Sequence, residues 1–421
     1  MRAARGATLL VLWGCGGESF RRPTTDDGVA ESGASGRSTS SAGGGASGSS
    51  QGSSGGTTFA GERALIPNYP CGVMATAGEW CRELYIGDGS NFVVALNSEG
   101  DLLLAGDETT DTAGHPGSDV FLAKYTQSGQ LEWVGRFGTE MPDLTADIAI
   151  DADDNVFVAG SSADDEFEAS GPFVAKLSTN GELLWFRQSS TGKKIRSAGV
   201  AVDASGNAVT VTQSGHVFKY SPSGELVWTD PPQDDSEGGD VVVDAAGNIF
   251  VLRTALPGAP AANSGATLAA LSPDSVGLWS RDLGGELPYQ MALDRSGELV
   301  LLGYDDEYNP ALSRYSATGD ELWTLRLDEN LDTVHDVSLD GAGNSFIVGT
   351  AKDRDSQEML SDSYVVEYDP SGRRLWGKPL GLRGPDLQRH LVASVDGNVF
   401  VTGSLTVAGM GAAFLVRVSM P

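Results

Sequence analysis

The feature that most constrains this chain is an internal repeat of about fifty residues. Each copy has an alternating apolar run, a turn rich in Asp, Asn and Gly, and a second apolar run. Seven copies of the turn occupy residues 97–101, 151–155, 203–207, 244–248, 294–298, 340–344 and 394–398. Asp or Asn caps such a turn through its side chain, and Gly or Asn accepts the positive φ of a tight hairpin. The steps between copies are 54, 52, 41, 50, 46 and 54 residues, so each copy has room for four short strands.

A second element of the repeat is a strand, a Ser/Thr-x-x-Gly turn, and a strand with Trp four residues after the Gly. The tryptophans that follow these turns are Trp133, Trp185, Trp228, Trp279, Trp323 and Trp376. The seventh copy stops at residues 414–418 without a Trp, whereas residues 78–86 contain Trp80 and precede the first copy. We therefore predict an all-β fold, a seven-bladed β-propeller of four-stranded blades whose ring is closed by the N-terminal strand. The tryptophans are expected to pack between blades.

The run from Asp119 to Trp133, followed by residues 146–151 and 156–160, resembles a known repeat. It is similar to the bacterial seven-bladed propeller repeats often called SBBP repeats, which occur in exported proteins of mostly unknown activity. This resemblance covers nearly all of residues 91–421 and implies the fold, with no particular activity. The Gly-to-Trp spacing is also similar to the tryptophan-docking repeat of quinoprotein dehydrogenases and outer-membrane assembly lipoproteins, which typically have eight blades.

The first sixty residues predict export and tethering. Arg2 and Arg5 precede an apolar run that ends at Gly14-Cys15, which is a secretory signal too short to span a bilayer. Residues 12–15 resemble a bacterial lipobox, which implies lipidation of Cys15 and, because Gly16 follows, an outer-membrane lipoprotein of the cell envelope, periplasmic or surface-exposed. Ser and Gly fill 19 of the 25 positions from 32 to 56, a composition that stays disordered. We therefore expect a lipoprotein signal peptide at 1–14, a disordered Ser/Gly-rich tether at 15–60 and the propeller at 61–421.

The three cysteines include one pair that suits an exported chain. Cys71 and Cys81 are ten residues apart, and a disulfide between them would pin the segment before the closing strand. Free thiols are the alternative. No cofactor is predicted with certainty, because Cys and His are too few for a metal cluster of those residues.

Charge and loop length together point to one face of the predicted disc. The chain carries 57 acidic and 28 basic side chains, and such a surface would repel nucleic acid. The longer connections, at 106–118, 160–171, 253–265, 349–362 and 403–411, and those between blades all emerge on one face. Loops on a rigid scaffold are where binding usually resides, and solvated insertions are the alternative. The acidic residues of the predicted binding face are Asp107, Glu108, Asp111, Asp164, Asp165, Glu166, Asp305, Asp306 and Glu307.

A ring of polar residues is predicted in the central channel, which the first strand of each blade lines. Four residues before the hairpin turn, blades two to seven carry Asp147, Gly199, Asp240, Gln290, Asp336 and His390, and blade one carries Val93. Asp147, Asp240, Gln290 and Asp336 would form a hard-oxygen site suited to calcium. The alternative is a set of wet channel residues bonded to water and to neighbouring backbone.

Three functions are compatible with this sequence. The first is a tethered, monomeric binding or scaffold module whose acidic loop face takes an envelope protein, a glycan or a cation, with the membrane contacted only through the lipid anchor. The second is a hydrolase or lyase that uses carboxylates on an extracellular glycan. The third is an outer-membrane assembly subunit. This function would require close docking to a membrane complex, so the flexible tether favours the binding module over it. The sequence favours the binding module over catalysis.

Overall fold

The computed structural model describes residues 79–84, 91–112, 115–139, 141–163, 170–189, 197–231, 236–255, 266–327, 330–351, 363–380, 389–407 and 410–418. The predicted signal peptide, the tether, Cys15 and Cys71 lie outside these residues. No helix in the described part of the chain is long and apolar enough to cross a membrane.

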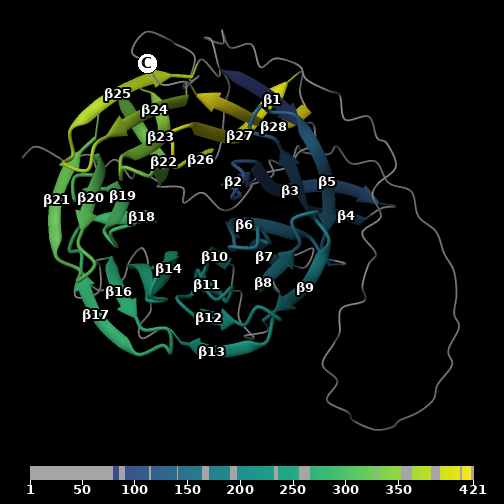
Figure 1. The fold of residues 1–421 in the computed structure, drawn as a ribbon, viewed down its shortest axis with the longest axis horizontal. Helices are drawn as coiled ribbons and strands as arrows, with labels where there is room; N and C mark the ends of the chain where they lie inside the picture. Colours follow the sequence, from purple (N-terminus) through teal and green to yellow (C-terminus); the bar gives the residue numbers. More distant parts are fainter. Residues whose placement is uncertain are drawn as a thin grey trace, which may run out of the picture. The chain divides into compact units, whose positions relative to one another are not determined.

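The described residues form seven four-stranded antiparallel sheets arranged as blades around a central axis (Figure 1). Blade 1 holds β2 (Val93–Leu96), β3 (Leu102–Thr112), β4 (His115–Tyr125) and β5 (Leu131–Phe137), and blade 2 holds β6 (Asp143–Ile150), β7 (Val156–Ala163), β8 (Ser170–Leu177) and β9 (Leu183–Gln188). Blade 3 holds β10 (Ser197–Val202), β11 (Ala208–Thr212), β12 (Val217–Tyr220) and β13 (Leu226–Asp230), and blade 4 holds β14 (Ser236–Val243), β15 (Ile249–Ala255), β16 (Thr267–Leu271) and β17 (Gly277–Asp282). Blade 5 holds β18 (Leu287–Leu293), β19 (Leu299–Tyr304), β20 (Pro310–Tyr315) and β21 (Glu321–Arg326), and blade 6 holds β22 (Leu331–Leu339), β23 (Ser345–Ala351), β24 (Ser363–Tyr368) and β25 (Arg374–Pro379).

Blade 7 joins the two ends of the sequence. Its strands, from the channel outward, are β26 (Arg389–Ala393), β27 (Val399–Val407), β28 (Met410–Val418) and β1 (Trp80–Leu84). β1 pairs with β28 in an antiparallel register from Trp80 opposite Arg417 to Leu84 opposite Ala413. This confirms the predicted seven-bladed propeller closed by the N-terminal strand.

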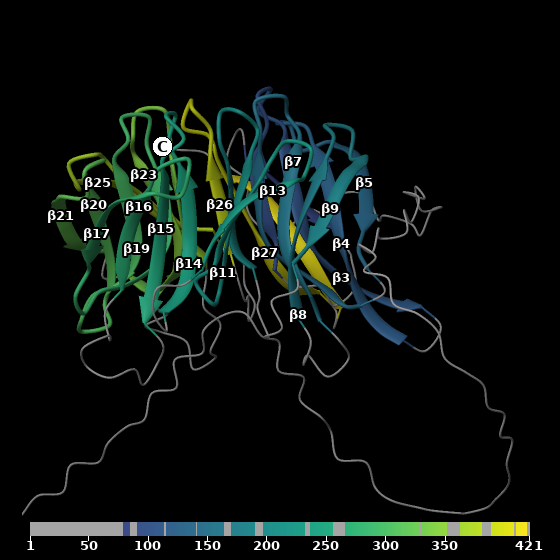
Figure 2. The same ribbon diagram turned by 90° about the horizontal axis from the view of Figure 1, so that it is seen from below.

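The connections divide between two faces of the disc, seen edge-on in Figure 2. The turns from first to second and from third to fourth strand share one face, here called the turn face. The connections from second to third strand, and those between blades, share the opposite face, here called the loop face. Turn-face hairpins are tight because each is capped internally: Asp203 Oδ1, for example, accepts hydrogen bonds from the Ser205 and Asn207 backbone N–H groups, and Gly206 takes a φ of 77°.

Each blade packs on the next through an apolar interface and a docked tryptophan. The clusters of buried aliphatic and aromatic residues span neighbouring blades; Val93 and Leu103 of blade 1, for instance, pack with Ile148 and Val158 of blade 2. The Trp of each outer strand covers the outer turn of the following blade. A Cβ placed on Gly129, whose φ is 79°, would lie 2.7 Å from the Trp80 ring, so this turn must carry Gly.

Hydrogen bonds from the indole N–H fix this docking. The Nε1 atoms of Trp80, Trp185, Trp228, Trp279 and Trp323 donate to the carbonyls of Gln127, Pro222, Pro273, Ala317 and Pro370, at 3.2, 2.9, 3.0, 3.2 and 3.1 Å. Trp133 packs on Gly181 of blade 2 without such a bond to a described residue. The buried Nε1 of Trp376 donates to no carbonyl of blade 7 among the described residues. It faces blade 7, whose third and fourth strands come from distant parts of the chain. Lys378 forms an ion pair with Glu79, beside β1, at this junction.

A basic residue on the third strand neutralises the turn-face hairpin in four blades. Lys124, Lys176, Lys219 and Arg314 pair with Asp101, Asp151, Asp203 and Asp294. Blade 6 carries Glu367 at this position, buried at 5% exposure. Burial raises the pKa of Glu367, the Trp376 indole opposes the rise, and the Asp340 charge adds to it. The sequence repeat is therefore broken by a carboxylate at a position where these four blades place a cation.

Deletion of residues 78–86 should abolish cooperative melting of the propeller. The change removes the outer strand of blade 7, and with it the contacts that Trp80 makes to blade 1 and Glu79 makes to blade 6. Because each blade is stabilised by two neighbours, the loss propagates around the ring. Calorimetry measures it, with deletion of residues 32–56 as the control that leaves the transition unchanged. Melting of the 78–86 deletion within a degree or two of the parent would contradict β1 as the closing strand.

Glu367→Lys should stabilise the propeller at neutral pH. A lysine restores the third-strand pair with the turn carboxylate, Asp340, and raises the melting temperature by about 1–3 °C, the shift that roughly 1 kcal/mol makes in a domain of this size. The gain over the parent should shrink on acidification, because a carboxyl with a raised pKa is neutral there. Glu367→Gln is the matched control for removing the charge alone. If the Lys variant melts below both the Gln variant and the parent, the pairing argument is wrong.

Candidate functional site

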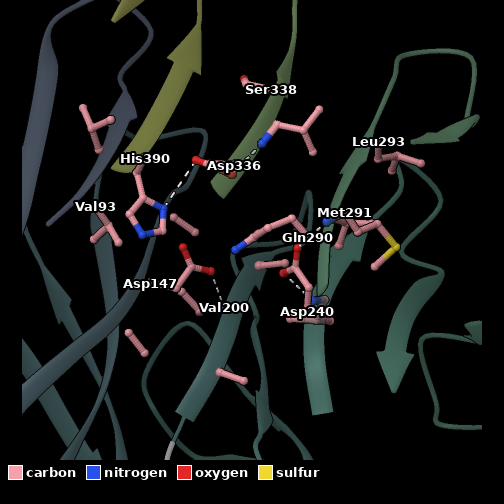
Figure 3. Close-up of a pocket in the computed structure, with 18 of the residues that line it drawn as sticks. Val93, Asp147, Val200, Asp240, Gln290, Met291, Leu293, Asp336, Ser338 and His390 are labelled. Carbon is pink, nitrogen blue, oxygen red and sulfur yellow. Dashed lines mark hydrogen bonds and ion pairs between the residues drawn. The ribbon is translucent and has the colours of Figure 1, made fainter. Parts of the chain in front are cut away.

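A cavity of about 360 Å³ lies in the central channel, bounded by the innermost strands of all seven blades. Aliphatic side chains make most of its wall, among them Val94, Val200, Val242 and Leu391. The titratable side chains that line it are Asp147, Asp240, Asp336 and His390, and Gln290 joins them (Figure 3). The structure therefore brings together all four residues of the predicted calcium site.

A β-bulge positions the polar ring in five of the blades. The register of the first strand shifts between Thr145 and Asp147 in blade 2 and between Val334 and Asp336 in blade 6. Equivalent shifts precede Gly199, Asp240 and Gln290. A bulge re-aims the side chain that follows it. This local irregularity, and not the alternation of the strand, sets where the channel residues lie.

Each of the three channel aspartates joins two blades through backbone N–H groups. Asp147 accepts from Ile148 N at 2.7 Å and from Val200 N of blade 3 at 2.8 Å. Asp240 accepts from Val241 N at 2.7 Å and from Met291 N of blade 5 at 2.8 Å. Asp336 accepts from Val337 N and from Leu391 N of blade 7, each at 2.8 Å. The bridges thus link blade 2 to 3, blade 4 to 5 and blade 6 to 7.

Small or neutral residues separate these carboxylates around the ring. Gly199 lies between two of them, since a Cβ there would be 3.0 Å from Asp240 Oδ1 and 3.6 Å from Asp147 Oδ2. His390 Nδ1 lies 3.4 Å from Asp336 Oδ2. Alternation of carboxylate and non-carboxylate keeps the charges from meeting directly.

The channel shifts the pKa values of its ionisable groups. Burial raises the pKa of Asp147 to about 6, against the two backbone hydrogen bonds and His390, which favour the charged form. Burial also raises the pKa of Asp240 well above its usual range, and the charge of Asp147 adds to this rise. Burial alone would lower the pKa of His390, but the hydrogen bond and charge of Asp336, with the charge of Asp147, outweigh it and raise the pKa. The channel therefore favours the neutral forms of Asp147 and Asp240 and the charged form of His390.

The carboxylate oxygens of the predicted calcium site are already used to join neighbouring blades. Both oxygens of each aspartate accept backbone hydrogen bonds, and among the described residues no three His, Cys, Asp or Glu side chains could hold a metal ion together. The contacts are those of the structural alternative, with carboxylates bonded to neighbouring backbone. Calcium binding by Asp147, Asp240, Gln290 and Asp336 stays a prediction without geometric support.

The residues predicted for the acidic binding face differ in burial, in pairing and in whether the structure describes them. Asp107 is buried at 3% exposure and so does not present its carboxylate to a ligand. Glu108 forms an ion pair with Arg136. Asp111 lies in β3, outside the residues whose side chains the structure describes, and residues 164–166, which include Asp164, Asp165 and Glu166, lie outside the described residues altogether.

The acidic turn of blade 5 is on the loop face, as predicted. Asp305 caps this turn through the Glu307 and Asn309 N–H groups, and Arg326 pairs with Asp305 at 2.6 Å and with Glu307 at 2.8 Å. Asp306, Glu307 and Tyr308 are exposed. Of the described residues predicted to bind, Asp306 and Glu307 are therefore the two that reach the surface.

Cys81 of β1 is disulfide-bonded. Its partner lies outside the described residues, so the predicted pairing with Cys71 stays a prediction. Cys81 packs against the cluster between blades 6 and 7 that also contacts Trp376.

Sequence reasoning missed a carboxylate pair near the loop face. Asp143 begins β6 and is fully buried, and Asp119 lies across Gly138 from it: a Cβ on Gly138 would be 2.6 Å from Asp143 Oδ2 and 2.9 Å from Asp119 Oδ1. Gly138 immediately after the strand that carries Trp133 is the signal that could have found it, because no side chain fits there.

Comparisons with known proteins show the fold and leave the family open. No protein-family model matches the chain, and no curated protein matches it. The β-propeller domain of Cps50 (Swd1) from Myceliophteria thermophila is similar at 10% identity and a TM-score of 0.55, over 84% of this chain and 100% of that one. The WD40 domain of Pan2 from Neurospora crassa is similar at 10% identity and a TM-score of 0.53, over 80% and 90%. BamB from Moraxella catarrhalis, at 14% identity over 83% and 94%, has a TM-score of 0.46, too low to carry an argument.

The stability of the ring should depend on the protonation of Asp147. A carboxyl whose folded pKa is raised contributes stability that is complete below its unfolded pKa, near 4, and is lost as the pH rises through about 6. A shift of this size corresponds to about 3 kcal/mol between pH 4 and pH 8. Denaturant unfolding of the parent and of Asp147→Asn across this range measures it, with Asp306→Asn as an exposed control. The Asn variant should lose this part of the pH dependence, and parallel curves for parent and Asn variant would refute it.

Proposed function

We propose that this propeller is a binding or scaffold module whose ligand contacts the loop face. The observation that carries the proposal is that the described second-to-third-strand connections differ from blade to blade. Blade 3 has a tight turn between Thr212 and His216, and blade 5 has the acidic turn at Asp305. Blade 1 has a hairpin of two eleven-residue strands. Variable connections on a rigid scaffold are the usual place of binding residues.

The turn face is a poorer candidate for ligand binding than the loop face. Its polar side chains are used inside their own turns: Asp203 binds Asn207, Asp340 binds Asn344, and Ser394 accepts from Asn398 N. The same capping recurs in blade after blade. A face of nearly identical, self-satisfied turns offers little that could distinguish one ligand from another.

The net charge of the chain limits the chemical class of the ligand. With a formal charge of −29, the surface disfavours polyanions and suits a cationic or hydrogen-bonding partner. We propose a protein or glycan of the bacterial cell envelope, reached by a lipidated Cys15 and the Ser/Gly-rich tether, with the module acting as a monomer. The signal-like N-terminus and the composition of residues 32–56 support export; nothing in the propeller itself depends on it.

Capture of a partner from cell-envelope extract tests the proposal. The bait is the chain from residue 61 onward, with and without calcium, and the expected result is a saturable partner that Asp306→Lys/Glu307→Lys weakens at least several-fold. The matched control is Asp274→Lys/Asp396→Lys, which reverses two exposed carboxylates on turn-face hairpins. Equal loss in both double variants would mean that net charge and not the loop face decides binding. Saturable binding that only the control variant weakens would move the site to the turn face.

A further inference from the structure

Blade 1 extends beyond its own sheet on the loop face. β2 pairs with β3 only as far as Val93 opposite Ala105, and β5 reaches β4 only as far as Phe137 opposite Val120. The remaining pairs, from Glu108 opposite Asp119 to Thr112 opposite His115, form a two-stranded ribbon, here called the arm (residues 108–112 and 115–119). Figure 2 shows β3 and β4 projecting past the disc.

The root of the arm rests on blade 2 through Asp143. Ser118 Oγ donates to the Asp143 carbonyl at 3.1 Å. The carboxyl of Asp143 accepts from Thr139 N, from Thr139 Oγ1 at 3.3 Å and from Ser162 Oγ. Asp119, the last residue of the arm, shares the Gly138 contact with this carboxyl. One buried residue therefore connects three parts of the fold. Its backbone carbonyl holds Ser118 of the arm, and its carboxyl, beside Asp119, holds the blade 1–2 linker and blade 2.

The charges around Asp143 make its ionisation unfavourable. Burial raises its pKa to about 6; the hydrogen bonds from Ser162 and Thr139 oppose the rise, and the charge of Asp119 adds to it. On β3, Asp107 is buried and Glu108 is paired with Arg136 of β5. β4 also packs against β6 and contributes Asp119, His115 at the tip of the arm, and Lys124, which is paired with Asp101 and Glu132. The remaining strands packed against β6, which are β2, β7 and β10, carry no titratable side chain. Arg136 is thus the cation near Asp143 and Asp119, and it forms its ion pair with Glu108.

We propose that Asp143 is a proton-controlled anchor for the arm. The neutral carboxyl holds the root of the arm against blade 2, and loss of its proton beside Asp119 loosens the arm. The sign follows from the raised pKa: the anchor is firm in acid and weakens as the pH rises through about 6. This inference rests on the proposed function for its biological meaning, because it makes a part of the loop face respond to pH.

Amide hydrogen exchange in the full chain tests the anchor. Protection factors of residues 109–112 and 115–118, corrected for the intrinsic pH dependence of exchange, are compared between pH 5 and pH 7.5. In the parent they should fall several-fold, with an upper limit of about a hundredfold for a two-unit pKa shift. Asp143→Asn, which is neutral throughout, should keep the same protection at both pH values, and Asp119→Asn should reduce the fall. Asp396→Asn, on the turn face, is the control that behaves as the parent.

Two results would overturn the anchor: a parent whose arm protection does not change with pH, or an Asp143→Asn variant that changes as much as the parent. If Asp143→Asn proves unstable, the Asp119→Asn series still decides, because it leaves Asp143 in place and removes the neighbouring charge. The exchange measurement needs no ligand, so the anchor can stand when capture finds no partner. Conversely, saturable binding that is equal at pH 5 and pH 7.5 leaves the proposed function intact and removes the link between anchor and binding.

Discussion

The packing of each outer-strand tryptophan on the next blade's turn is the interaction on which the ring depends. It joins blades that the chain connects only through loops, and it acts in one direction around the disc. A ring of such contacts is complete only if the last blade also receives and donates one. Trp80 of β1 donates to blade 1, whereas Trp376 meets a blade whose outer strands come from distant parts of the sequence. At that junction the buried indole N–H donates to no carbonyl of blade 7 among the described residues, and the Lys378–Glu79 pair joins blade 6 to the residue before β1.

The central channel must accommodate buried carboxylates in a ring with an odd number of blades. Seven inner strands converge on one axis, and three of them bring a carboxylate. Placing the aspartates on blades 2, 4 and 6 gives each a neighbouring strand whose N–H groups it can accept, so burial is offset by hydrogen bonds rather than by a cation. Blades 7 and 1, which are neighbours, carry His390 and Val93 instead. The raised pKa values of Asp147 and Asp240 show that this compensation is incomplete, although the bridges themselves favour the charged form.

The blade count, the closing strand and the packing of the tryptophans follow from the sequence because they rest on local chemistry repeated seven times. Asp-x-x-Gly-Asn fixes a turn, and Trp four residues after Gly fixes the docking strand. Asp147, Asp240 and Asp336 were placed around one channel from the sequence, which left open whether they bind a cation or neighbouring backbone. A bulge before each residue turns its carboxylate toward backbone N–H groups. Asp107 was expected at the surface and is buried, because β3 continues past the usual end of its sheet. Such features depend on register between strands, which no single segment encodes.

The distribution of charge connects these parts. Ion pairs with turn carboxylates are formed by Lys124, Lys176, Lys219 and Arg314. On the loop face, Arg136 pairs with Glu108 and Arg326 pairs with Asp305. Basic side chains therefore neutralise carboxylates within the fold and leave the excess of acid unpaired elsewhere. The net charge of −29 repels an anionic ligand and favours a cationic one at low ionic strength. Under the proposed function, a ligand on the loop face would meet residues that differ between blades, so selectivity and charge attraction would coincide there.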